Sequence, residues 1–161
     1  MNVAICYASK TGTTKTCAEK LKKLLPGATL YNLETEKMSP EKYACIIVGG
    51  SIRMGKLHKE AAAFIKNNKD ILMERKCAFF MCNGFPEQAE QFFLQNVEKE
   101  LLEHSICAAS FGGEMDLSKQ KGFDKMVAKA VMNSTKNNPD AAPKILEERI
   151  AQFAEIIKDN L

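Results

Sequence analysis

Four hydroxyl side chains surround a glycine close to the start of the chain. They belong to the hexapeptide Ser9-Lys10-Thr11-Gly12-Thr13-Thr14, which follows an apolar run over 3–8 and leads directly into a helical pattern. At a strand-to-helix turn of this kind, backbone N–H groups and hydroxyl oxygens can converge on an anion at the helix amino terminus. The hexapeptide therefore predicts a phosphate-binding loop.

Ordinary helix capping is the alternative explanation of these hydroxyls, because Ser and Thr are favoured at helix starts. Capping requires one hydroxyl, whereas four cluster around Gly12, so the pattern favours a phosphate site. The nucleoside-triphosphate loop GxxxxGK[ST] is absent, and the dinucleotide motif GxGxxG is excluded because Gly12 is the only glycine among the first 26 residues. We expect Lys10 to be solvated rather than paired with the phosphate.

Strand-like and helical patterns alternate along the chain. Short apolar runs typical of strands cover Val3–Ala8, Ala28–Leu33, Tyr43–Gly49, Lys76–Cys82 and Ile106–Phe111. Amphipathic patterns typical of helices cover Thr13–Leu25, His58–Asn67, Glu87–Glu103 and Lys144–Lys158. Strands such as the one containing Cys45-Ile46-Ile47-Val48 are apolar on both faces, which indicates burial between two helical layers. The sequence therefore predicts a doubly wound α/β fold with a parallel sheet and three layers.

Ligands of such folds bind beyond the carboxyl ends of the strands. The segments that follow the first, third and fourth predicted strands are therefore the ones expected to line a site. They are Ser9–Thr14, Gly49–Gly55 and Cys82–Pro86.

Length and composition favour one soluble domain over 1–161, because 45% of the residues are hydrophobic and 27% are charged. No apolar stretch reaches the roughly 18 residues that a membrane span requires. The start of the chain lacks the pattern of a secretory signal, so we expect a cytoplasmic protein. A net charge of +3 without interleaved aromatic residues gives no nucleic-acid footprint.

The six cysteines form no CxxC pair, and most fall inside predicted strands. We expect reduced thiols that pack in the core. A redox or metal site is the alternative, but no ligand spacing is recognisable, and only His58 and His104 could assist. Cys82 ends a predicted strand, where a side chain could face a ligand, although core packing is expected there too.

The loop Ser9–Thr14 resembles the [ST]-x-T-G-x-T phosphate loop of the flavodoxin superfamily, and the alternation of elements is similar along essentially the whole chain. The resemblance implies a five-stranded parallel sheet of order 2-1-3-4-5. It also implies noncovalent FMN at the carboxyl edge of that sheet.

Within this superfamily, the segment Gly49–His58 is similar to the G-A-S-I-R-Y-G-x-x-H segment of menaquinone-dependent protoporphyrinogen oxidases. This closer resemblance implies an oxidoreductase that passes electrons through FMN to or from a quinone or a small organic substrate. Two departures are Met54, which stands where those enzymes have an aromatic residue, and Cys82–Pro86, which leads almost directly into a helix. The short segment favours the alternative, an electron-transfer flavodoxin that shuttles electrons between protein partners. A flavodoxin-like interaction module that has lost its flavin is a third possibility.

The resemblance implies FMN contacts from all three segments and no catalytic side chain or metal. The expected contacts are Ser9, Lys10, Thr11, Gly12, Thr13 and Thr14, then Gly50, Ser51, Ile52, Arg53, Met54 and Gly55, and finally Cys82, Asn83, Gly84 and Phe85. The chain has no Trp, so Ile52, Met54 and Phe85 are expected to pack on the flavin ring. Backbone hydrogen bonds are expected from Gly50, Ser51, Asn83 and Gly84.

Basic side chains outnumber acids around this expected site. They are Lys10, Arg53, Lys56, His58 and Lys59, with Glu60 and Glu87 as the first acids. Such surroundings favour the anionic reduced flavin and a less negative potential. Arg53 either lies beside the flavin or orders its own loop, and these alternatives are evenly balanced. We expect His58, at a predicted helix start, to lie at the surface rather than to donate a proton.

Lysines also accumulate over 119–136, against the single acid Asp124. This segment could make a weak membrane-surface contact, but a solvated helix face is the favoured explanation. The expected partners are thus a redox protein or a quinone, and the sequence leaves the oligomeric state open.

Overall fold

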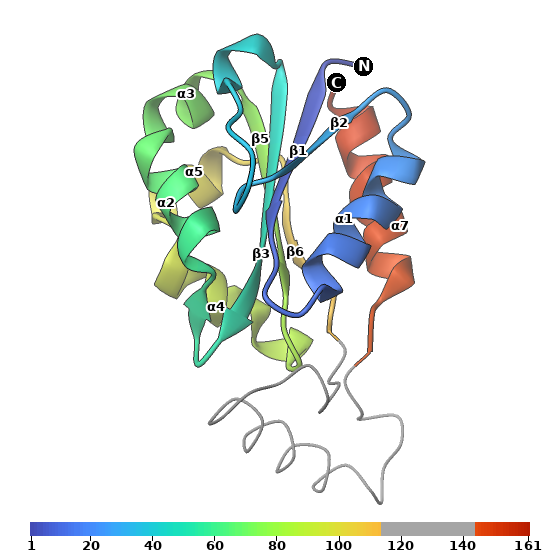
Figure 1. Ribbon diagram of the computed structural model, residues 1–161, viewed down its shortest axis with the longest axis vertical. Coiled ribbons are helices and arrows are strands. Elements are labelled where there is room, and N and C mark those ends of the chain that lie inside the picture. The colour runs from blue at the N-terminus through green and yellow to red at the C-terminus, as the bar shows by residue number, and fades with distance from the viewer. Residues whose placement is uncertain (114–143) are drawn as a thin grey trace, which may run out of the picture.

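The computed structural model describes residues 1–113 and 144–161, in which a twisted sheet forms the centre of the molecule (Figure 1). Its strands are β1 (Val3–Ala8), β2 (Thr29–Asn32), β3 (Cys45–Arg53), β4 (Lys56–Leu57), β5 (Lys76–Cys82) and β6 (Ala108–Ser110). The parallel strands have the order β2-β1-β3-β5-β6, and β4 pairs antiparallel with the end of β3.

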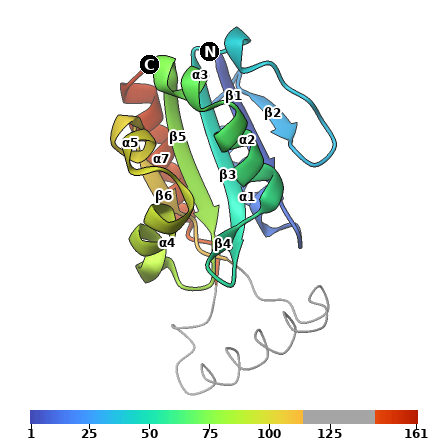
Figure 2. The ribbon, with the colours of Figure 1, turned by 90° about the vertical axis from the view of Figure 1, so that its left-hand side faces the viewer.

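Helices cover both faces of this sheet. They are α1 (Thr13–Leu24), α2 (Lys59–Asn67), α3 (Lys69–Glu74), α4 (Ala89–Asn96), α5 (Lys99–His104) and α7 (Glu147–Asp159), with short 3-10 turns η1 (Pro40–Lys42) and η2 (Pro86–Gln88). Helices α1 and α7 lie on one side, and α2 to α5 lie on the other, as Figure 1 and the turned view in Figure 2 show. The three-layer, doubly wound α/β architecture is therefore confirmed.

The predicted strand order 2-1-3-4-5 is also confirmed, since the fourth and fifth predicted strands are β5 and β6. The bounds of β1 and β5 are the predicted ones. The prediction of five strands missed β4, which forms because β3 continues past Gly49 to Arg53 and then folds back.

The predicted helix over Glu87–Glu103 is wrong, because the chain breaks between α4 and α5. Val97 has the extended dihedral angles φ −126° and ψ 136°, and its side chain is buried in the core. Phe93, Val97 and Leu101, on the two sides of the break, all belong to one core cluster. The predicted helix over Lys144–Lys158 begins three residues later, at Glu147.

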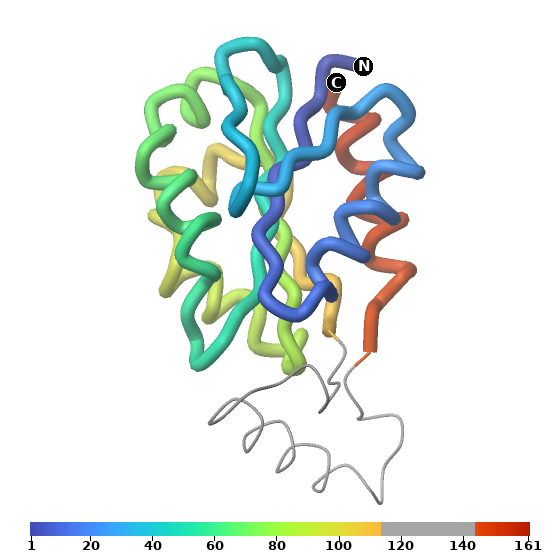
Figure 3. The backbone as a smooth tube through the Cα atoms, viewed as in Figure 1, coloured from blue at the N-terminus to red at the C-terminus, as the bar shows by residue number. Residues whose placement is uncertain are grey.

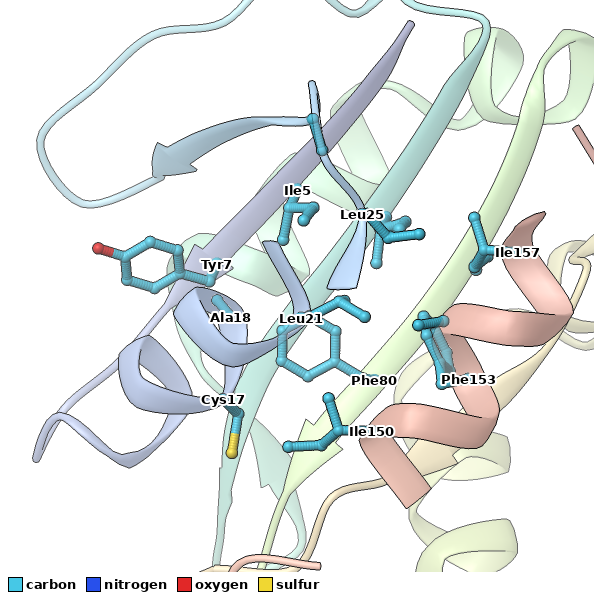
Figure 4. Close-up of a cluster of buried hydrophobic side chains, with 14 of the residues drawn as sticks. Ile5, Tyr7, Cys17, Ala18, Leu21, Leu25, Phe80, Ile150, Phe153 and Ile157 are labelled. Carbon is cyan, nitrogen blue, oxygen red and sulfur yellow. The ribbon is translucent and has the colours of Figure 1, made fainter. Parts of the chain in front are cut away.

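The core on the α1 and α7 side is built around Phe80 of β5. In Figure 4, Leu21 of α1 and Phe153 of α7 point toward this ring from two helices that are far apart in sequence. Phe80 stacks on Phe111 with ring centroids 4.7 Å apart, and Phe153 meets Phe111 edge to face at 5.2 Å. The aromatic contacts join the end of the chain to the middle of the sheet.

Gly49 is required by this packing. A Cβ atom built at Gly49 would lie 2.0 Å from Cζ of Phe80, so no larger residue fits beside the ring. The opposite face has its own core of Phe79, Met81, Leu72 and Leu101. The central strands are thus buried on both sides, as their apolar sequences indicate.

The amino and carboxyl termini lie at the same end of the molecule, which is opposite to the end where the strands finish (Figure 3). The segments after β1, β3 and β5 therefore meet at one edge of the sheet. No helix in the described ranges 1–113 and 144–161 is long and apolar enough to cross a membrane. The basic segment 119–136 lies outside the described residues, and its membrane contact stays a prediction.

Neighbouring isoleucines on α7 allow a test of this packing. Ile157 is fully buried, whereas Ile156 is 41% exposed. We expect Ile157→Ala to lower the free energy of unfolding by about 2–5 kcal/mol, because it leaves a cavity under the helix. Ile156→Ala serves as the matched control and should cost about 1 kcal/mol or less. Urea unfolding followed by circular dichroism measures both, and equal losses would contradict the described packing of α7.

Candidate functional site

The turn between β1 and α1 carries the hydroxyl cluster predicted from the sequence. Gly12 is the N-cap residue immediately before α1, with a left-handed φ of 96°, and its backbone amide donates to Oγ of Ser9 at 3.0 Å. No side chain within residues 1–113 and 144–161 caps the amino end of α1. Within the described residues, the hydroxyls of the loop therefore do not cap α1, and the first-turn amides have no described side-chain acceptor.

Thr14 is the residue of this loop that most clearly lacks a partner. Its side chain is fully buried beside the Cys82 thiol, and its hydroxyl offsets part of the rise in the pKa of that thiol. The hydroxyl makes no hydrogen bond of normal geometry with any described residue. A buried hydroxyl without a partner is unfavourable by about 1–3 kcal/mol. An anion at the start of α1 would relieve this cost, since the hydroxyl can donate to it together with the helix amides.

Ser51 gives a second buried hydroxyl without a described partner, at the end of the neighbouring strand. Side chains alternate along β3, and Gly49 faces the Phe80 side of the sheet. Two residues further on, Ser51 faces the same side, which is also the side of α1. Two polar groups that need partners thus lie at the ends of β1 and β3, which are adjacent strands.

Beyond Ser51, β3 continues into a tight hairpin that leaves the sheet. Met54 and Gly55 connect Arg53 to Lys56, and both have positive φ values, of 52° and 74°. This is the pattern of a type I′ turn, in which Asn or Gly is usual at the position that Met54 occupies. Met54 is 65% exposed at the tip, while Arg53 is half-buried at its base.

The segment after β5 is fixed by the buried side chain of Asn83. Its Nδ2 donates to the carbonyl of Phe85 at 2.6 Å, and its Oδ1 accepts a hydrogen bond from the hydroxyl of Ser110. The backbone N–H of Asn83 donates to the carbonyl of Gly112 at 2.9 Å. Asn83 therefore holds Gly84 and Phe85 at the edge, where Phe85 is 39% exposed.

Two predicted contact residues are held within the strand ladder. Gly50 pairs with Ala8 on one side and with Met81 on the other, and Leu57 fills the space beside it. Cys82 is paired with Ser51 and buried. The other predicted residues surround the edge itself, and contacts of the whole set with a cofactor stay predictions.

The prediction that His58 lies at the surface is wrong. Its side chain is only 10% exposed, and Nε2 lies 2.9 Å from Oε1 of Glu34. Nδ1 accepts a hydrogen bond from the amide of Glu60 at 3.2 Å and so caps α2. Since Nδ1 accepts, Nε2 carries the ring proton and donates it to Glu34. The acid nearest to His58 thus comes from the turn after β2, and it offsets part of the positive charge at this edge.

Tyrosines are not available to stack on a ligand ring at this edge. Tyr7 is buried in β1, and burial raises its pKa. The hydroxyls of Tyr31 and Tyr43 lie 2.5 Å apart and bond to each other. The sequence predicted that Tyr43 begins a strand, but Tyr43 follows η1 and lies before β3.

The cysteines behave as core thiols. Burial raises the pKa of Cys6, Cys45 and Cys77 to about 12 and that of Cys107 to about 11. The neighbouring Cys17 thiol, together with burial, raises the pKa of Cys82 well above its ordinary value. Within the part of the chain that the structure describes, no group of His, Cys, Asp or Glu side chains is arranged to hold a metal ion.

The edge as a whole combines the hydroxyl-bearing turn with a half-exposed apolar surface. Hydroxyls and helix amides can hold a phosphate, while Ile52, Met54 and Phe85 come from the two neighbouring segments. A family model described as a flavodoxin domain matches residues 4–142 of this sequence. The chain belongs to the flavodoxin domain family.

Solved flavodoxins share the fold of this flavodoxin domain at low identity. The oxidised Flavodoxin 2 from Bacillus cereus is 18% identical, with a TM-score of 0.54 and coverage of 100% of both chains. A flavodoxin from Fusobacterium nucleatum bound to flavin mononucleotide is 13% identical, with a TM-score of 0.53 and coverage of 99% of this chain and 98% of that one.

A flavoprotein from Lactobacillus acidophilus NCFM in complex with FMN is also similar in fold. It is 14% identical, has a TM-score of 0.55, and matches over 68% of this chain and 92% of its own. At such identities the likeness concerns the fold alone. None of the curated proteins matches this sequence significantly.

The raised pKa values predict slow thiol chemistry in this flavodoxin domain. Buried thiols stay protonated at pH 8, and the thiolate is the reactive form. We expect little reaction of the native protein with an aromatic disulfide reagent, and Cys107, which is only half-buried, should react first. Cys107→Ser should remove this earliest phase, and guanidinium should expose all six thiols. Rapid reaction of several thiols in the native protein would contradict their described burial.

Proposed function

We propose that this flavodoxin domain is a redox protein that holds FMN noncovalently at the carboxyl edge of its sheet. One observation carries the proposal: the fully buried Thr14 hydroxyl makes no hydrogen bond of normal geometry within the described residues, beside a helix start that no described side chain caps. A phosphate monoester fits both features, because it accepts hydrogen bonds from a hydroxyl and from helix amides. The FMN bound by the similar proteins from Lactobacillus acidophilus and Fusobacterium nucleatum supports this choice.

The chain's own groups would divide the binding between phosphate and ring. Thr14, the amides at the start of α1 and the Ser51 hydroxyl are the groups that suit the phosphate end. The hairpin residues Ile52 and Met54, together with Phe85 after β5, suit the flavin ring. When bound, FMN supplies one- and two-electron transfer, and no side chain need act as acid or base. The exposed Lys10, Lys56 and Lys59 keep the edge cationic despite Glu34.

The finer proposal is an oxidoreductase that exchanges electrons with a quinone or a small organic substrate, as the similarity of Gly49–His58 to protoporphyrinogen oxidases implies. Electron transfer between protein partners is the second candidate, and the short connection from β5 to η2 favours it, since it adds no loop for a substrate.

Valine at position 14 tests the phosphate site. Thr14→Val keeps the shape of the side chain and removes the hydroxyl, so we expect FMN affinity to fall about tenfold to a hundredfold. Thr16→Val is the matched control, because the Thr16 hydroxyl bonds to the carbonyl of Gly12 and is exposed. Fluorescence titration with FMN and with riboflavin measures both variants.

Riboflavin lacks the phosphate, so Thr14→Val should leave its affinity unchanged. Equal loss of affinity for FMN and riboflavin would place the hydroxyl elsewhere in the site. Absence of FMN binding by the unaltered protein would overturn the proposed function and favour a module without flavin.

The two redox roles differ in the kinetics of reoxidation. Anaerobically reduced holoprotein should pass electrons to a water-soluble naphthoquinone with a rate that saturates, because an enzyme binds its substrate before transfer. Stopped-flow absorbance of the flavin measures this rate. A rate that stays linear with quinone but saturates with a small electron-transfer protein would support the carrier role instead.

A further inference from the structure

The hairpin formed by β3 and β4 lies beyond the support of the main sheet. On one side the parallel ladder ends at Ala8 with Gly50, and on the other it ends at Ser51 with Cys82. Among the described strands, none therefore runs parallel beside residues 52–57. The hairpin pairs only Ile52 with Leu57 and Arg53 with Lys56, and an isolated pair of this length is not stable by itself.

Asn96 holds this hairpin from the side of α4. Its Nδ2 donates to the carbonyl of Gly55 at 2.8 Å, and its Oδ1 accepts from the amide of Leu57 at 2.9 Å. The same Nδ2 also donates to the carbonyl of Phe92 at 2.8 Å, which secures the last turn of α4. Every polar atom of the Asn96 amide is thus in use, and its orientation is fixed.

Contacts around Gly55 show how closely the turn approaches α4. A Cβ atom built at Gly55 would lie 3.5 Å from Oε1 of Gln95 and 3.9 Å from a ring carbon of Phe92. The turn is therefore seated on the helix, with the Asn96 amide bridging the two. The break of the chain after Asn96 places this side chain at the helix end.

A second anchor acts from the opposite side. The amide of His58 donates to the carbonyl of Ser51 at 2.9 Å, and the His58 ring bonds to Glu34 in the turn after β2. The hairpin is thus held between α4 and the β2 turn. Beyond the end of the parallel ladder, the side chains of Asn96 and His58 therefore tie the hairpin to α4 and to the β2 turn.

We propose that Asn96 is a positioning residue for the flavin site, which it serves by fixing the β3–β4 hairpin. This inference rests on the proposed function, because Ile52, Arg53 and Met54 face a flavin only if one binds at this edge. Asn96 touches no ligand itself. It acts through the backbone at Gly55 and Leu57 and so determines where the hairpin side chains stand relative to the ring.

Asn68 offers a matched control for this role. Its Nδ2 donates to the carbonyl of Phe64 at 2.8 Å, which is the same helix-end bond that Asn96 makes to Phe92. Asn68→Ala removes this bond alone, whereas Asn96→Ala also removes both bonds to the hairpin. A difference between the two variants therefore reports the hairpin bonds and not the helix end.

Amide hydrogen exchange of the apoprotein tests, without flavin, whether the Asn96 side chain holds the hairpin. In Asn96→Ala the Leu57 amide should exchange at least about tenfold faster than in the unaltered protein, because its acceptor is gone. In Asn68→Ala its exchange should be unchanged. Unchanged exchange of the Leu57 amide in Asn96→Ala would overturn the inference that Asn96 holds the hairpin.

Flavin titration and potentiometry of the full chain then test positioning. Asn96→Ala should lower the affinities for FMN and for riboflavin by the same factor, about tenfold, since the hairpin is proposed to face the ring and not the phosphate. It should also shift the midpoint potential of bound FMN, which a merely structural change would leave alone. Normal affinity and potential in Asn96→Ala would overturn the role of Asn96. Failure of the unaltered protein to bind any flavin would overturn the proposed function instead. The exchange rates would still show whether Asn96 holds the hairpin.

Discussion

The parallel pairing of β1 with β3 is the constraint on which the proposed site depends. Val3 to Ala8 run beside Cys45 to Gly50 in unbroken register, with both strands buried on both faces. Because the strands are parallel, they finish together, and the turn after β1 emerges beside the hairpin after β3. The Thr14 and Ser51 hydroxyls come to the same edge for this reason.

Burial of the central strands is secured differently on their two faces. On the α1 and α7 side, the stacked rings of Phe80 and Phe111 receive Phe153 from the end of the chain, and Gly49 leaves room for them. On the other side, Gly50 leaves room for Leu57, which belongs to the hairpin. The core and the site are thus linked, since Leu57 packs against Gly50 in the core and also belongs to the hairpin.

The fold could be predicted from the sequence where burial alone decides it. The bounds of β1 and β5 follow from apolar runs that permit no other placement in a three-layer protein. The hairpin could not be predicted, because β4 has two residues and Met54 is unusual in its turn. The break at Val97 could not be predicted, because Phe93, Val97 and Leu101 have the four-residue spacing of one continuous helix face. For the site, the loop Ser9–Thr14 was visible as a motif, whereas the bonds of His58 to Glu34 and of Asn96 to the hairpin join distant segments.

The central claim is that the turn Ser9–Thr14 binds the phosphate of FMN, and NMR of the backbone amides tests it most directly. Addition of FMN to the labelled protein should shift the amide resonances of residues 10–14 more than those of any other described segment, with smaller shifts at the hairpin. Riboflavin should reproduce the hairpin shifts but not those of the turn. Largest FMN shifts at another edge of the sheet, or equal shifts of the turn with both ligands, would contradict the account.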